Sequence, residues 1–85
     1  MTEPDIFQVD GHRIRGYELL RRKVSRSGKS SGRVVLPPEW AGKGVKVVLD
    51  GEVYEDWARA GGQQARINVH HSHIGEVVPV VRVDP

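Results

Sequence analysis

The chain has 85 residues, with 13 Lys and Arg against 11 Asp and Glu, and it contains no Cys. The lack of Cys excludes disulfides and thiolate metal sites. No apolar run approaches the roughly 20 residues that a membrane-spanning helix needs. A chain this short buries only about 60–65% of its unfolded surface, so a partner subunit is a common source of further stability. With no signal peptide in the first 18 residues, we expect a cytoplasmic protein without membrane association.

The net charge of +2 is unevenly distributed. Residues 1–46 hold ten Lys and Arg against five acidic residues, a net charge of +5. Residues 47–85 hold three Arg against six acidic residues, a net charge of −3. A basic half of this kind favours a polyanionic partner, with a merely solvated surface as the alternative.

The first 50 residues predict an arm followed by a core. Residues 1–13 form the N-terminal arm, in which Ile6, Phe7 and Val9 offer a short edge strand and Gly11 a turn. Residues 14–50 form the core. Its first strand is predicted over 19–25, because the turn sequence SGKSSG follows at once, and a helix over 17–24 is the alternative.

The second part of this core is predicted as strand, short helix and strand. The run 33–36 ends at Pro37, and Pro38 can occupy the first position of a one-turn helix that closes at Gly42. Alternation over 45–49 then predicts a half-buried strand. The expected core residues are Val34, Leu36, Trp40, Val45, Val47 and Leu49.

Residues 51–85 are predicted to form a C-terminal extension packed on or beside this core. The pair Asp50-Gly51 is typical of a turn. Residues 52–60 predict a short helix that buries Tyr54 and Trp57. Two strands follow over 65–71 and 77–83, and Pro79 places the second at a sheet edge or a bulge. No internal repeat is visible.

Residues 16–49 resemble two related groups of proteins. The runs VVLP at 34–37, PEW at 38–40 and VKVVL at 45–49 resemble the swapped-hairpin DNA-binding domains of the AbrB/MazE/SpoVT type. The longer run from Gly16 to Leu49 is similar to a family of small archaeal transposon-encoded proteins of uncharacterised function. The resemblance implies a mainly β fold with one or two short helices, an AbrB-like core and a homodimer of interlaced strands.

Six basic residues form the main candidate site. A two-stranded ribbon fits the major groove of double-stranded DNA, where Arg can read guanine or bind phosphate. Turn amides around Gly28 add possible phosphate contacts. The candidate nucleic-acid-binding residues are Arg21, Arg22, Lys23, Arg26, Lys29 and Arg33.

No other pattern predicts a catalytic, cofactor or metal site. The GKS at 28–30 lacks the remainder of a P-loop. His70, His71 and His73, even with His12, fit no standard zinc spacing, so we expect surface or half-buried imidazoles on an edge strand and no metal. A small metalloprotein that uses this cluster is a third interpretation. The chain is therefore expected to be a non-enzymatic DNA-binding protein, a transcriptional regulator or an accessory factor of a mobile element.

The alternative function is an antitoxin-like or adaptor module. In this interpretation the extension captures a partner protein through its acidic residues beside Trp57, which are Asp50, Glu52, Glu55 and Asp56.

Overall fold

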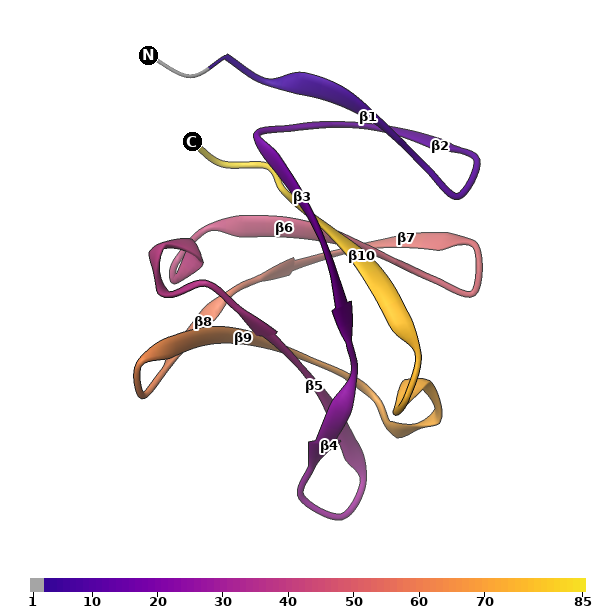
Figure 1. Cartoon of the computed structure of the whole chain (residues 1–85), viewed down its shortest axis with the longest axis vertical. Coiled ribbons are helices and arrows are strands. Elements are labelled where there is room, and N and C mark those ends of the chain that lie inside the picture. The colour runs from indigo at the N-terminus through magenta and orange to yellow at the C-terminus, as the bar shows by residue number, and fades with distance from the viewer. Residues whose placement is uncertain (1–2) are drawn as a thin grey trace.

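The computed structural model describes residues 3–85 and contains ten strands (Figure 1). The strands are β1 (Asp5–Val9), β2 (His12–Gly16), β3 (Glu18–Lys23), β4 (Ser25–Ser27), β5 (Ser31–Leu36), β6 (Gly44–Leu49), β7 (Glu52–Trp57), β8 (Arg59–Gly61), β9 (Gln64–His70) and β10 (Val77–Arg82). Two single 3₁₀ turns, η1 (Pro38–Trp40) and η2 (His71–His73), complete the described elements. Within residues 3–85, no helix is long and apolar enough to cross a membrane.

The strands form three antiparallel sheets. The hairpin β1-β2 lies at one end of the molecule (Figure 1). A central four-stranded sheet has the order β3-β10-β6-β7, and a second four-stranded sheet has the order β4-β5-β9-β8. We call these the central sheet and the outer sheet. Residues 52–82 thus contribute two strands to each four-stranded sheet, and β10 lies between β3 and β6.

The two halves of the chain follow the same path. The series β3, β4, β5, η1, β6 recurs as β7, β8, β9, η2, β10, with β5 paired to β9 and β6 paired to β10. Val24 exchanges backbone hydrogen bonds with Gly75 and Glu76 (2.9 and 2.8 Å), and Ala58 does the same with Gly42 and Lys43 (2.8 and 2.9 Å). The two halves are therefore related by a pseudo-two-fold axis.

This structural repeat is not visible in the sequence, because few equivalent positions of the two halves carry the same residue. Gly42 and Gly75 correspond and both have positive φ (+81° and +93°), a conformation that favours Gly. Val47 and Val80 correspond and pair directly across β6 and β10. Most of the remaining equivalent positions differ in size or charge, as with Trp40 and His73.

The two inner strands of the central sheet, β6 and β10, are buried on both faces. Val47 and Val80 face the outer sheet in the main core, whereas Val48 and Val81 pack under the β1-β2 hairpin with Val9 and Ile14. All six predicted core residues are buried, which confirms that prediction. The prediction of a half-buried strand over 45–49 is wrong at Val48, because the hairpin covers that face. Two-sided burial explains the consecutive Val residues in β6 and β10.

The predicted fold class is wrong in its helices, although the mainly β content is confirmed. The segment after Pro37 forms only the three-residue turn η1, and Gly42 ends it at positive φ. A three-residue segment between two strands is too short for an α-helix, because the conformational entropy lost in nucleating a helix exceeds the stabilisation from a single turn. The core with a short helix is therefore replaced by strands joined through 3₁₀ turns.

The predicted helix over 52–60 is also wrong. Asp50 and Gly51 both have positive φ (51° and 77°), the geometry of a two-residue type I′ hairpin turn. That turn directs β7 back along β6 over its whole length. Asp10 and Gly11 form the same kind of turn between β1 and β2, so the possible edge strand of the arm is a regular hairpin strand.

Pro79 occupies a strand with neighbours on both sides, unlike the predicted edge strand. β10 pairs with β3 from Val77 to Arg82, but with β6 only from Val80 to Arg82. Pro79 therefore lies where β10 has a single partner, and no ladder hydrogen bond to β6 is lost there.

Candidate nucleic-acid interface

The outer sheet carries no acidic residue. Its strands β4, β5, β8 and β9 lie within two acid-free tracts, residues 19–38 and 57–75. The sheet and its β4-β5 turn instead hold five cationic side chains: Arg26, Lys29, Arg33, Arg59 and Arg66. Every Asp and Glu in residues 3–85 lies outside this sheet, so no carboxylate within it offsets the positive charge.

Three of these arginines share the outward face. Burial alternates along β5 and β9, which turns Val34 and Ile67 into the core and Arg33 and Arg66 away from it. Arg66 pairs directly with Arg59 on β8 and with Val35 on β5. Arg33 pairs with Asn68, which places it diagonally across from Arg66, at a spacing of roughly 7–8 Å for such neighbours.

This arrangement costs stability unless an anion compensates for it. Like charges directly opposite on neighbouring strands, as in Arg59 and Arg66, are destabilising. Arg33 donates a hydrogen bond from Nη2 to the hydroxyl of Ser27 (3.0 Å). The Nε atoms of Arg33 and Arg66 are buried without a hydrogen-bond partner in the described part of the chain. These buried Nε atoms do not reach an external anion, but guanidinium groups on an outward face without carboxylates are chemically suited to phosphate oxygens.

The structure divides the six predicted residues between two surfaces. Arg33 is on the outward face of the outer sheet, and Lys29 lies in the β4-β5 turn at its margin. Arg26 pairs with the buried Gly32 and therefore points to the opposite face of the β4-β5 hairpin from Arg33. Arg22 lines a groove of about 320 Å³ with Val35 and Gln64, beside that face. Arg21 and Lys23 alternate with Arg22 along β3 and point to the other side of the central sheet.

Sequence reasoning missed Arg59 and Arg66. Counting charges by halves placed both in an acidic half, although β9 pairs with β5 over six residues. The acid-free tract 57–75 was the signal that could have found them, because its length matches the tract 19–38 that contains the predicted site.

The strand equivalent to β3 has the opposite charge. β7 carries Glu52, Glu55 and Asp56 at the edge of the central sheet, and Trp57 and Tyr54 are 62% and 47% exposed. The prediction that both aromatic residues are buried is wrong, since β7 is an edge strand. Tyr54 donates a hydrogen bond to Glu52 (2.8 Å), and this contact raises the pKa of Tyr54 above its ordinary value of 10.0.

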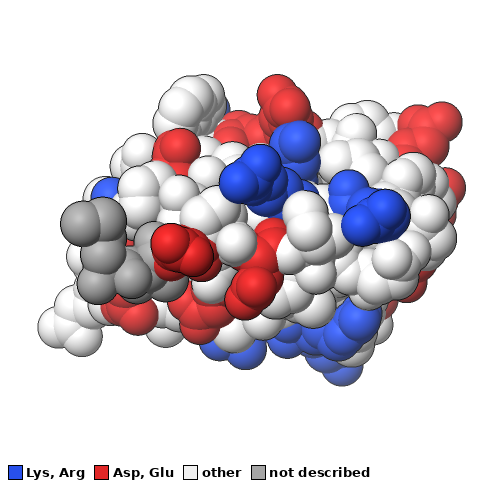
Figure 2. Space-filling view, turned by 90° about the horizontal axis from the view of Figure 1, so that it is seen from above, with Lys and Arg blue, Asp and Glu red and all other residues white. Residues whose placement is uncertain are grey.

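The end of the molecule that carries the β1-β2 hairpin shows no segregation of charge. Figure 2 views this end, where acidic and basic side chains are interspersed. Arg13 and Arg15 are exposed on β2, one residue to either side of the buried Ile14. They supply a basic pair that is remote in the fold from the outer sheet.

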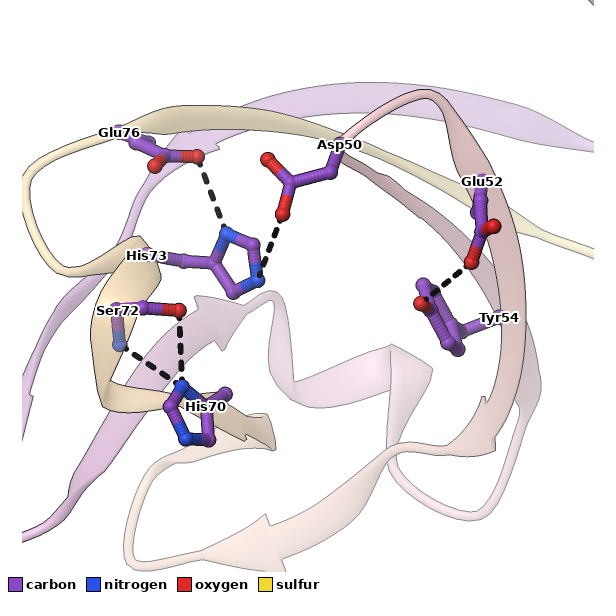
Figure 3. Close-up of polar contacts among 7 residues, drawn as sticks. All are labelled: Asp50, Glu52, Tyr54, His70, Ser72, His73 and Glu76. Carbon is purple, nitrogen blue, oxygen red and sulfur yellow. Dashed lines mark hydrogen bonds and ion pairs between the residues drawn. The ribbon is translucent and has the colours of Figure 1, made fainter.

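His70 and His71 are exposed, as expected for surface imidazoles, whereas His73 is buried. Residues 71–73 form η2 in place of the predicted continuation of the strand. Nδ1 of His70 is occupied by the hydroxyl and the backbone N–H of Ser72 (2.8 and 3.2 Å). His73 is only 7% exposed and lies between Asp50 and Glu76 (Figure 3).

Comparison with known proteins gives no relative. No family model matches the chain, and no match is found among curated proteins or solved structures.

Proposed function

We propose that this protein binds double-stranded DNA through the outward face of the outer sheet and the adjoining β4-β5 hairpin. The observation that carries the proposal is the acid-free sheet with Arg33, Arg59 and Arg66 on one face. Three arginines held together without carboxylates are electrostatically complementary to a polyanion with regularly spaced charges, such as DNA.

The β4-β5 hairpin supplies the element that would enter a groove. A two-stranded ribbon fits the major groove, and this one carries Arg26 and Lys29 near its tip. Arg33 and Arg66 occupy equivalent positions about the pseudo-two-fold axis, so both strands of a duplex would meet an arginine. Phosphate contacts of this kind position a protein on DNA, and the hairpin would add base contacts.

The two arms flanking this face differ, which gives the proposed complex a direction. β3 carries Arg21, Arg22 and Lys23, whereas the corresponding positions of β7 are Glu55, Asp56 and Trp57. Arg22, which lies beside the proposed face, would therefore extend the DNA contact on the β3 side, whereas Arg21 and Lys23 point to the other side of the central sheet. The resemblance of residues 16–49 to transposon-encoded proteins supports a role as a regulator or accessory factor of a mobile element, acting in the cytoplasm where DNA is present.

Fluorescence anisotropy on a random-sequence duplex of about 20–25 bp tests the proposal. Each phosphate contact contributes about 0.9 to the slope of log K against log salt, so Arg33→Gln with Arg66→Gln should lower the slope by about 2. The matched control is Arg13→Gln with Arg15→Gln, which removes the same charge from the β1-β2 hairpin. A third variant, Arg21→Gln with Lys23→Gln, measures the contribution of the far side of β3.

The control decides between a specific face and general charge. Equal losses in the two double variants would mean that only net charge matters, and the assignment to the outer sheet would fail. Absence of binding by the parent protein at about 50 mM salt would refute DNA binding itself, because non-specific binders associate under those conditions.

A second function is supported by the β7 edge. Trp57 lines a groove of about 410 Å³ with Glu55, Asp56 and Asp84, and the strand offers unpaired backbone groups. An exposed aromatic residue beside three carboxylates suits a basic segment of a partner protein, as in an antitoxin or adaptor. Trp57→Ala should abolish capture of such a partner and leave the DNA salt slope unchanged.

A further inference from the structure

We propose that Asp50, His73 and Glu76 form a binding site for a divalent transition-metal ion. Their ligand atoms lie within 4.8 Å of one another, where the β6-β7 turn meets η2 (Figure 3). Nε2 of His73 and a carboxylate oxygen of Asp50 would bind the ion. Glu76 would orient the imidazole, and water would complete the coordination.

The contact between His73 and Glu76 prepares the imidazole for a metal ion. Nδ1 lies 3.2 Å from Oε1 of Glu76, a contact in which the ring N–H donates to the carboxylate. A proton held on Nδ1 leaves the lone pair on Nε2, which is the form that binds metals. A carboxylate on the second ring nitrogen is the usual partner of a metal-bound His and increases its basicity.

Asp50 faces the free nitrogen. Its Oδ2 lies 3.9 Å from Nε2 of His73, which is beyond hydrogen-bond distance. Two ligands of one tetrahedral ion, each at about 2.0–2.2 Å, are separated by roughly 3.4 Å. A small rotation of the exposed Asp50 side chain is therefore enough to place one ion between both atoms.

The backbone that carries Asp50 is held in place. Asp50 has positive φ (51°) in a two-residue hairpin turn. His12 Nε2 donates a hydrogen bond to the carbonyl of Gly51 (2.6 Å), which ties the turn to β2. The site thus joins a fixed turn to a buried imidazole, so the backbone of Asp50 and the ring of His73 are ordered on folding, and the exposed carboxylate side chains remain to be ordered by the ion.

The pseudo-two-fold axis shows what a purely structural residue looks like at this position. Trp40 is the equivalent of His73, is fully buried, and donates from Nε1 to Glu18 (3.3 Å). In the second half the smaller His73 lines an open cavity of about 350 Å³ with Tyr54, Asn68 and His70. Packing alone favours the Trp at this position. The carboxylates of Asp50 and Glu76 do not line this cavity but approach the two ring nitrogens of His73 directly, and that contact indicates a ligand.

The donor set selects the class of metal. One imidazole nitrogen with carboxylate oxygens and water suits zinc, nickel or copper better than magnesium or calcium, which prefer oxygen ligands alone. Two direct protein ligands give a weaker site than a structural zinc with four. Zinc is the appropriate probe because it is stable to redox change.

The experiment is a zinc titration of the full-length protein followed by side-chain ¹H–¹⁵N NMR. Metal binding moves the ¹⁵N resonance of the ligating nitrogen, which reports on His73 directly. His70→Gln with His71→Gln serves as the background, because those exposed rings are alternative zinc ligands. Asp50→Asn tests the second ligand and keeps the turn, since Asn tolerates positive φ.

Matched variants separate coordination from charge. Asp56→Asn removes one carboxylate from the cavity that His73 lines and is the charge-matched control for Asp50→Asn, because Asp56 makes no ion pair with His73. We expect one zinc ion, a shifted His73 Nε2 resonance, and a loss of affinity of about 10–100-fold for Glu76→Gln. Asp50→Asn should weaken binding at least as much, and Asp56→Asn should change it little.

Three results would overturn the proposal. An unmoved His73 resonance while zinc binds would place the metal elsewhere. Equal weakening by Asp50→Asn and Asp56→Asn would reduce the effect to charge. The absence of zinc binding would make the three residues a structural ion-pair cluster. The test uses no DNA, so its outcome is independent of the proposed function.

Discussion

Replacing Ile67 by Ala tests whether the second half of the chain is part of one core. Ile67 is fully buried on β9, opposite Val34 on β5. Removal of three carbons from a packed Ile costs about 2–5 kcal/mol, the sum of lost transfer energy and the cavity left behind. A domain of this size has a total stability of only about 5–15 kcal/mol.

The chain offers a matched control on its surface. Ile6 is 53% exposed on β1, so Ile6→Ala loses little burial and should cost less than about 1 kcal/mol. Urea unfolding followed by circular dichroism measures both variants. With a slope of about 1 kcal/mol per molar urea, Ile67→Ala should lower the midpoint by about 2 M or more, and Ile6→Ala by under 1 M.

Unfolding of the same two variants also tests whether residues 51–85 form a separate extension. If residues 51–85 only rested on a self-sufficient core, Ile67→Ala would affect a minor second transition and leave the main midpoint in place. Equal midpoints for Ile67→Ala and Ile6→Ala, or two separable transitions, would refute the interleaved arrangement of β5 and β9.

Three further predictions follow from the same structure. A chain cut after Asp50 should be unfolded as a monomer by circular dichroism, because it lacks β9 and β10; a folded fragment of monomer mass would contradict the sheet order. Gly16→Ala should destabilise the protein by about 1–3 kcal/mol, since the added Cβ would lie 2.7 Å from the carbonyl oxygen of Arg82. Gly61→Ala is the control and should destabilise the protein less, because its Cβ meets only the flexible side chain of Arg66. Similar thermal midpoints for the two variants would argue against this packing. Glu52→Gln should lower the pKa of Tyr54 toward 10, seen as earlier phenolate absorbance near 295 nm on raising the pH, because the carboxylate stabilises the protonated phenol; an unchanged titration would show that the contact is absent in solution.

Local patterns in the sequence predicted much of the first half. The strands near 33–36 and 45–49 and the six core residues were accessible from alternation, Pro and Gly. The strand predicted over 19–25 is divided at Val24, so that β3 joins the central sheet and β4 the outer sheet. The turn at Asp50-Gly51 was recognised as well, but its hairpin consequence was outweighed by a helical pattern over 52–60. Hairpin geometry prevails there because β6 would otherwise have an unpaired edge.

The remaining errors concern long-range pairing. Nothing near Val77 indicates that β10 inserts between β3 and β6, since its pairing with β3 joins residues more than 50 positions apart and its pairing with β6 joins residues more than 30 positions apart. The candidate site was divided for the same reason: Arg33 was found from its local basic run, whereas Arg59 and Arg66 join it only through the pairing of β5 with β9. His73 likewise becomes a buried neighbour of Asp50 only when η2 meets the β6-β7 turn.

The central position of β10 also sets the order in which the chain can fold. The β1-β2 and β6-β7 hairpins close through two-residue turns, an event that takes microseconds. β3 and β6 cannot be joined through a short turn, because β10, which lies between them in the sheet, must first be brought back across the molecule. The late insertion of β10 should therefore limit the folding rate to the millisecond-to-second range of proteins dominated by distant contacts. Until that step is complete, the unpaired backbone edges of β3 and β6 are exposed to association with other chains.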